Sequence, residues 1–171
     1  MSFPLFEAEF IAQQVVDKMA PFCSRIEIAG SIRRRCRQVN DIEIVAVLKP
    51  GKMWGFAQLV LALGKLVKGS PGNKFIQIRL KQHITLDLFL AVPENWGMIL
   101  AIRTGSAEYS RRVLATGWVI KGYQSEGGVL YPFKKVLGKD VLDKYNPVFL
   151  KEEKDVFDFI GIPWKEPKDR D

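Results

Sequence analysis

The sequence is poor in the residues that build soft-metal sites and disulfide frameworks. It has one histidine and two cysteines, Cys23 and Cys36, in 171 residues. Structural and catalytic zinc sites take most of their ligands from these two residue types, so a zinc protein is excluded. Two cysteines are also too few for a disulfide scaffold. We expect both thiols to stay reduced in a cytoplasmic or nuclear-type compartment.

Long apolar runs and a basic N-terminus are missing as well. No stretch approaches the roughly 20 apolar residues that span a bilayer. The first ten residues, "MSFPLFEAEF", contain acids where a signal peptide has basic residues. We therefore expect a protein that is neither secreted nor associated with a membrane.

The chain has an excess of positive charge. Lysine and arginine number 26 against 19 acids, which gives a net charge of +7. Such a surplus suits a polyanionic partner, because lysine and arginine release counterions when they meet phosphates. Many basic proteins never bind nucleic acid, so the charge alone does not identify the partner.

Hydrophobic periodicity predicts an α+β protein in two parts. The first part is α/β, and its predicted helices span residues 5–19 and 55–69. Its predicted strands span residues 25–30, 41–48, 74–82 and 84–92, with a tight turn near Gln82 and His83. The second part is smaller, with helices at 95–105, 107–118 and 150–162 and a hairpin of strands 118–123 and 128–133. The boundary is predicted between residues 93 and 105.

Three acids interrupt the apolar strands of the first part. Asp41 and Glu43 are two residues apart in "DIEIVAVL", so they share one face of a strand, and Asp87 lies inside "HITLDLFLAV". If the two strands are neighbours, three carboxylates converge and repel one another unless divalent cations neutralise them. Oxygen ligands without histidine or cysteine favour Mg²⁺ or Mn²⁺. The alternative is that Asp41 and Glu43 lie on the solvated face of an edge strand.

A Gly-Ser pair followed by arginines precedes the first two acids, in "GSIRRRCRQVNDIEI". Backbone N–H groups at Gly30 and the hydroxyl of Ser31 can approach phosphate oxygens, and Arg34 lies three residues on, on the same side of a helical turn. A solvated basic turn is the alternative, and we prefer it for Arg35 and Arg37.

These motifs resemble those of family X DNA polymerases within the nucleotidyltransferase superfamily. "GSIRRRCRQVNDIEI" is similar to the signature of a Gly-Ser pair and two acids, and "LDLF" to the strand of the third acid. "RTGSAEYSRR" resembles the Thr-Gly-Ser turn between palm and nucleotide-selecting subdomain, and "EKDVFDFIGIPWKEPKDRD" resembles the C-terminal helix and tail.

The resemblance implies a nucleotidyltransferase palm over residues 1–100 and a thumb-like, nucleotide-selecting subdomain over 101–171. Asp41 and Glu43 would bind two Mg²⁺ ions, and Asp87 would bind the catalytic one beside the primer 3′-hydroxyl. The implied nucleotide-binding residues are Gly30, Ser31, Arg34, Asn40, Arg103, Thr104 and Gly105. We also expect Arg111, Arg112, Lys74 and Lys81 to contact DNA.

The expected activity is DNA-directed DNA polymerisation at a primer 3′-end, typical of short-gap repair, with pyrophosphate release. We expect a monomeric enzyme without a lyase or helix-hairpin-helix domain, similar to the small polymerases that some viruses carry. If it is viral, we expect it in the virion or the host cell. Ile102 and Arg103 replace the aromatic pair that excludes ribonucleotides in the family. This replacement leaves a template-independent transferase, or one acting on RNA or small acceptors, as an alternative. A non-catalytic DNA-binding relic of the fold is a further alternative.

Overall fold

The computed structural model describes residues 2–171 and divides into two compact units, Met1–Val92 and Pro93–Asp171. We call them unit 1 and unit 2. The division falls at the start of the boundary region predicted from the sequence. Among the helices of residues 2–171, none is both long and apolar enough to cross a membrane.

Unit 1 is built on a five-stranded mixed sheet. Its strands lie in the order β2-β4-β7-β6-β5, and only β4 and β7 run parallel. The strands are β2 (Cys23–Ile28), β4 (Asp41–Leu48), β5 (Gly64–Lys68), β6 (Phe75–Leu80) and β7 (Thr85–Ala91). A small antiparallel pair, β1 (Phe3–Pro4) and β3 (Gln38–Val39), accompanies it.

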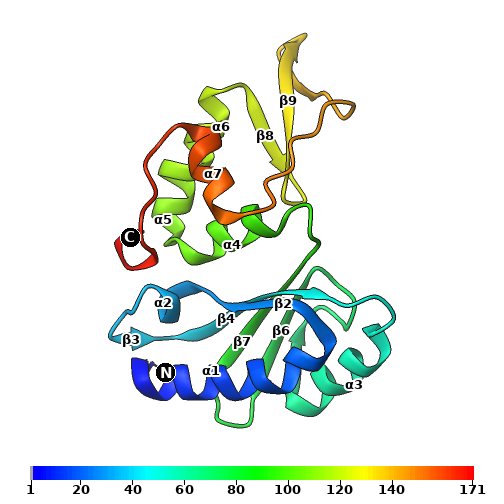
Figure 1. Ribbon diagram of the computed structural model, residues 1–171, viewed down its shortest axis with the longest axis vertical. Coiled ribbons are helices and arrows are strands. Elements are labelled where there is room, and N and C mark those ends of the chain that lie inside the picture. Colours follow the sequence, from blue (N-terminus) through cyan, green and yellow to red (C-terminus); the bar gives the residue numbers. More distant parts are fainter. Residues whose placement is uncertain (1) are drawn as a thin grey trace. The chain divides into compact units, whose positions relative to one another are not determined.

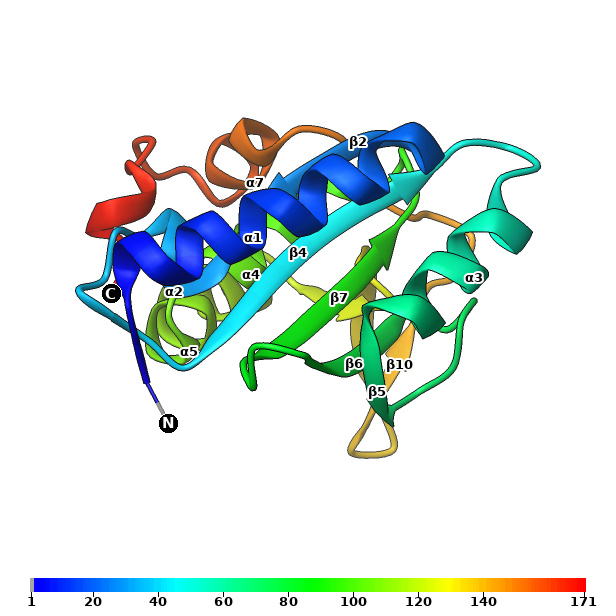
Figure 2. The same cartoon turned by 90° about the horizontal axis from the view of Figure 1, so that it is seen from below.

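Two helices, α1 (Leu5–Met19) and α3 (Met53–Leu63), cover one face of this sheet (Figures 1 and 2). Even-numbered residues of the central strands point toward these helices, because side chains alternate along a strand. Ile44, Ile78 and Leu88 are fully buried there and pack in one core with Ala12 and Phe56. The odd-numbered face is the one that carries Asp41, Glu43 and Asp87.

The predicted elements of unit 1 need two corrections. The helix expected over residues 55–69 ends at Leu63, and Gly64–Lys68 forms the edge strand β5 instead. Gly64 begins this strand so close to β6 that a Cβ atom would lie 2.2 Å from the Arg79 carbonyl oxygen. The strand expected over 25–30 ends at Ile28, and Gly30–Arg33 forms the one-turn helix α2. The 3₁₀ turn η1 (Ala20–Phe22) connects α1 to β2.

Unit 2 packs helices against a three-stranded antiparallel sheet of order β10-β9-β8 (Figure 1). The helical segments are α4 (Trp96–Thr104), α5 (Ala107–Tyr109), the π-helical η2 (Ser110–Ala115), α6 (Thr116–Ile120), α7 (Glu153–Ile160) and the 3₁₀ turn η3 (Pro167–Asp169). Met98, Leu114, Leu130 and Phe157 are fully buried in the core of this unit.

The hairpin of unit 2 begins later than predicted. Residues 118–120 belong to α6, and the strands are β8 (Tyr123–Glu126), β9 (Val129–Val136) and the unpredicted β10 (Lys139–Leu142). Helix α7 ends at Gly161, whose φ of 78° is the left-handed conformation that glycine adopts without strain. Its start has a capping box between Glu152 and Asp155.

Candidate active site on the first sheet

The three acids of unit 1 meet on neighbouring strands. In the parallel pairing of β4 with β7, Glu43 lies opposite Asp87, and Asp41 lies opposite Thr85 two residues earlier. All three acids are partly buried on the odd-numbered face. The condition for the acids to share one region is thus met, because the two strands are neighbours, and β4 is a central strand rather than an edge strand.

The electrostatics of Asp41 show that negative charge is concentrated here. Burial raises the pKa of the Asp41 carboxyl above its ordinary value, and the charge of Asp87 raises it further. A backbone hydrogen bond and the Arg34 guanidinium act in the opposite direction without cancelling the rise. A site that holds two anions this close gains free energy when a cation enters it.

Gln77 contacts the cluster and was missed in the sequence. It lies opposite Asp87 in the antiparallel pairing of β6 with β7, and its Nε2 donates a hydrogen bond of 2.8 Å to Asp87 Oδ1. The sequence feature that could have identified Gln77 lies in the strand "KFIQIRLKQ", where this polar residue stands between the buried residues Ile76 and Ile78.

Gly30 is required by Glu43. Its φ is +60°, and a Cβ atom there would lie 2.0 Å from Glu43 Oε2. The Glu43 carboxylate therefore lies against the backbone at the start of α2. The sequence suggested that the missing side chain admits phosphate oxygens, whereas in this structure the space is taken up by Glu43.

Two of the remaining expected nucleotide-binding residues, Ser31 and Arg34, lie in or next to α2. Ser31 Oγ is buried and finds no hydrogen-bond partner among residues 2–171, which is unusual for a hydroxyl group. Arg34 ends α2 close enough to Asp41 to influence its pKa. Asn40 is exposed immediately before β4.

The donor set of the cluster fits a hard divalent cation. Carboxylate oxygens of Asp41 and Asp87 supply the ligand type that Mg²⁺ and Mn²⁺ prefer. With the side chains as they stand, no group of three acids, histidines or cysteines within residues 2–171 is arranged to hold a metal ion.

The expected nucleotide-selecting residues lie in unit 2, at the end of α4. Thr104 is fully buried, Arg103 lies half-buried in the last turn, and Gly105 ends the helix. A Cβ at Gly105 would lie 2.8 Å from Ser110 Oγ, which itself donates a hydrogen bond to Ile102 O. The turn is thus tightly packed from within its own unit.

The C-terminal tail fixes this turn, through residues that the sequence did not single out. The Ser106 N–H donates to Arg170 O at 2.9 Å. The Arg170 side chain is fully buried, pairs with Glu153 at 2.5 Å and lies 4.6 Å from the Trp164 ring centroid. The sequence feature that could have indicated this contact is the ending "EPKDRD". Its arginine, Arg170, pairs with Glu153 in the preceding helix α7.

The expected DNA-binding residues are all exposed but are not gathered by one element. Arg111 and Arg112 lie on η2, and Arg112 forms a surface ion pair with Glu108 at 2.8 Å. Lys74 precedes β6. Lys81 borders a cavity on the helix-covered face of the sheet, opposite the carboxylates.

Comparison with known proteins identifies the fold. No family model matches the sequence, and no curated protein does either. Among solved structures, the crystal structure of Leishmania infantum polymerase beta in a ternary P/T complex is similar, with a TM-score of 0.76 and 20% sequence identity. The match covers 100% of this chain and 77% of that chain. The protein therefore has a fold like that of this polymerase beta, and the predicted α+β class is confirmed.

Proposed function

We propose that unit 1 carries the active site of a nucleotidyltransferase, and specifically of a family X-type DNA polymerase that extends primer 3′-ends at short gaps. The observation that carries the proposal is the strand register, which sets Glu43 beside Asp87 with Asp41 on the same face. A fold like that of a polymerase beta supports the reaction class, and the motif resemblance supports DNA as the acceptor.

In the proposed reaction the primer 3′-oxygen loses its proton to water and bonds to the α-phosphorus of a nucleoside triphosphate. The bond from that phosphorus to the bridging oxygen breaks, and pyrophosphate leaves. Two Mg²⁺ or Mn²⁺ ions, held by Asp41, Glu43 and Asp87, would neutralise the phosphates and activate the attacking oxygen.

The protein's own residues position the reactants. Gln77 fixes the orientation of Asp87 through its 2.8 Å hydrogen bond. Arg34 and the hydroxyl of Ser31 would hold phosphate oxygens, and this role is supported by the buried Ser31 Oγ, which has no hydrogen-bond partner among residues 2–171. Positioning of this kind supplies most of the catalysis in phosphoryl transfer, since the chemistry needs little covalent help.

The test is extension of a labelled primer on a one-nucleotide-gapped duplex. Each deoxy- and ribonucleotide is supplied singly with Mg²⁺, and Asp87→Asn is compared with Asp17→Asn, a matched change on the exposed side of α1. We expect template-matched addition that Asp87→Asn loses and Asp17→Asn keeps.

Other outcomes separate the alternatives. Addition that ignores the template favours a terminal transferase, and equal use of ribonucleotides favours the RNA or small-acceptor class that Ile102 and Arg103 leave open. Tight DNA binding without metal-dependent turnover would make the protein a non-catalytic relic and would overturn the proposal.

A further inference from the structure

A cavity of about 270 Å³ lies on the helix-covered side of the first sheet, on the opposite face from Asp41 and Asp87. Its inner wall is apolar. Ile11 and Val15 from α1, Leu63 from α3 and Leu80 from β6 line it, and all four are buried. An unfilled apolar wall next to a packed core is an incomplete contact that a hydrocarbon group can complete.

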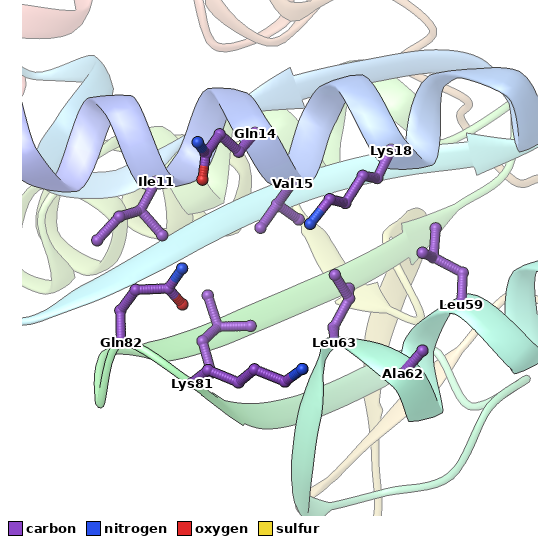
Figure 3. A pocket seen from close by; sticks show the side chains of 10 residues that line it. Ile11, Gln14, Val15, Lys18, Leu59, Ala62, Leu63, Lys81 and Gln82 are labelled. Atoms are coloured by element: carbon purple, nitrogen blue, oxygen red, sulfur yellow. The ribbon is translucent and has the colours of Figure 1, made fainter.

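The mouth of the cavity is positively charged. Lys18 from α1 and Lys81 from the β6–β7 turn both border it, as do the amides of Gln14 and Gln82. Figure 3 shows the two lysine side chains reaching in from opposite walls, one along the helix and one along the strand below. No acidic residue lines the cavity.

These two ammonium groups have no anionic partner among residues 2–171. Neither Lys18 nor Lys81 forms a salt bridge or side-chain hydrogen bond with another residue in the described range 2–171. The other lysines with ion pairs, such as Lys135 and Lys154, show that nearby acids are used where they exist. Two cations of this kind at one apolar opening favour an anionic group from outside.

We propose that this cavity binds a small anionic amphiphile, a compound with an aliphatic body and a single carboxylate or phosphate head. The aliphatic body lies against Val15, Leu63 and Leu80, and the head lies between Lys18 and Lys81. A nucleic-acid backbone would meet the lysines but leave the apolar wall empty, and a neutral hydrocarbon would fill the wall but leave the charges unmatched. The site lies on the other face of the sheet from the proposed catalytic acids, and Lys81 is the one residue that it shares with the expected DNA contacts.

Binding is tested on the full chain with two probes, octanoate for a carboxylate head and octyl phosphate for a phosphate head. Isothermal titration calorimetry measures the affinity, with 1-octanol, octyltrimethylammonium and acetate as comparison compounds. We expect saturable one-to-one binding of at least one anionic probe, and weaker or no binding of all three comparison compounds. The stronger of the two anionic probes identifies the head group.

Variants locate the site. Lys18→Gln and Lys81→Gln should each weaken binding about two- to fivefold, the range for partly solvated ion pairs, and together by more than either alone. Ala62→Phe, which places a ring at the cavity wall, should abolish binding. Lys65→Gln on β5 is the matched control, and Asp87→Asn tests independence from the acids; both should bind as the unaltered protein does.

Nuclear Overhauser contacts between octanoate protons and the Val15 and Leu63 methyl groups provide a second measurement, which needs no variant to fold. Absence of saturable binding by both anionic probes would overturn the proposal. Affinity that is unchanged in the double lysine variant, or octanol binding as tightly as octanoate, would overturn it too.

Discussion

Glu153 in unit 2 is almost fully buried beside an arginine with no exposed surface, whereas Asp41 in unit 1 is half-buried beside another acid. Glu153 pairs with Arg170 at 2.5 Å, and the guanidinium also stacks on Phe157 and Trp164. Asp41 has the Asp87 charge nearby, and its pKa rises as a result of burial and that charge.

The difference is that the buried charge of unit 2 is matched by a counter-ion, whereas the acidic charge of unit 1 is not fully compensated. A buried ion that finds its counter-ion within the chain is neutralised when the chain folds. Acids that gather without enough positive charge raise the free energy of the folded state, and such strain persists where a function requires it. Unit 2 uses its acid to fix a tail, and unit 1 leaves its acids with an excess of negative charge that the proposed cation would neutralise.

The largest effect is expected when the unit 1 cluster loses one acid. Asp87→Asn removes a proposed cation ligand, and several kcal/mol of transition-state stabilisation correspond to roughly a thousandfold loss of turnover. The free energy of unfolding should stay the same or rise by up to about 1 kcal/mol, because a like-charge repulsion disappears. Primer extension and urea denaturation measure the two effects. Equal losses of activity and stability would show that Asp87 is a structural residue.

The opposite result is expected for the unit 2 pair. Arg170→Met leaves Glu153 buried without its counter-ion, which costs about 3–5 kcal/mol of unfolding free energy. Urea denaturation should show much of this loss restored when Glu153→Gln is added, because the uncompensated charge is gone. A loss in the double variant equal to the sum of the single losses would mean that the pair does not act as a unit.

Gly30 tests whether the approach of Glu43 to α2 is needed. Gly30→Ala forces a side chain into the left-handed region, which costs about 1–2 kcal/mol. The added Cβ would lie only 2.0 Å from Glu43 Oε2, so the Glu43 carboxylate has to move. We expect reduced stability in urea denaturation and reduced primer extension. In a Glu43→Ala background the steric part of the stability loss should vanish and the backbone part remain. A full loss in that background would assign the whole effect to the backbone.

A smaller effect is expected at Gln77, which orients the Asp87 carboxylate but is not itself a proposed metal ligand. Gln77→Ala frees the Asp87 carboxylate, and loss of such an orienting partner costs about tenfold or more in metal affinity. The Mg²⁺ concentration for half-maximal extension should rise while the rate at saturating Mg²⁺ changes little. Gln13→Ala on α1 is the matched control. A lower saturating rate with unchanged Mg²⁺ dependence would place Gln77 in the chemical step.

Alternation and apolar spacing were enough to predict most of unit 1. Helix Leu5–Met19 and strand Asp41–Leu48 begin and end where the sequence predicts. Both elements are long, and each has one periodicity. The strand Gly64–Lys68 was missed because "GKLVK" continues the apolar run of α3, and only pairing with β6 makes it extended. A contact between distant segments overrode the local pattern there.

The candidate site divides in the same way. The placement of Asp41, Glu43 and Asp87 on one face of the sheet followed from the spacing along each strand, given that the strands pair. Neither the Gln77 contact nor the Arg170–Glu153 pair follows from spacing, because each depends on side chains brought together by packing. The Gln77 contact could be predicted only once the pairing of β6 with β7 was known.

A third way to bury an ionisable group is to keep it neutral, and Cys23 does so at the start of β2. Burial raises the pKa of the Cys23 thiol from 9.0 to about 11, against a smaller opposite effect of Lys49. A pKa raised in the folded state gives stability that is complete below pH 9 and is lost as the pH rises toward 11. At pH 10 the loss is on the order of 1 kcal/mol relative to a Cys23→Ala variant. Urea denaturation of both proteins between pH 7 and pH 10 isolates this difference, since all other titrations are shared. Parallel pH profiles would mean that the thiolate is tolerated at this position.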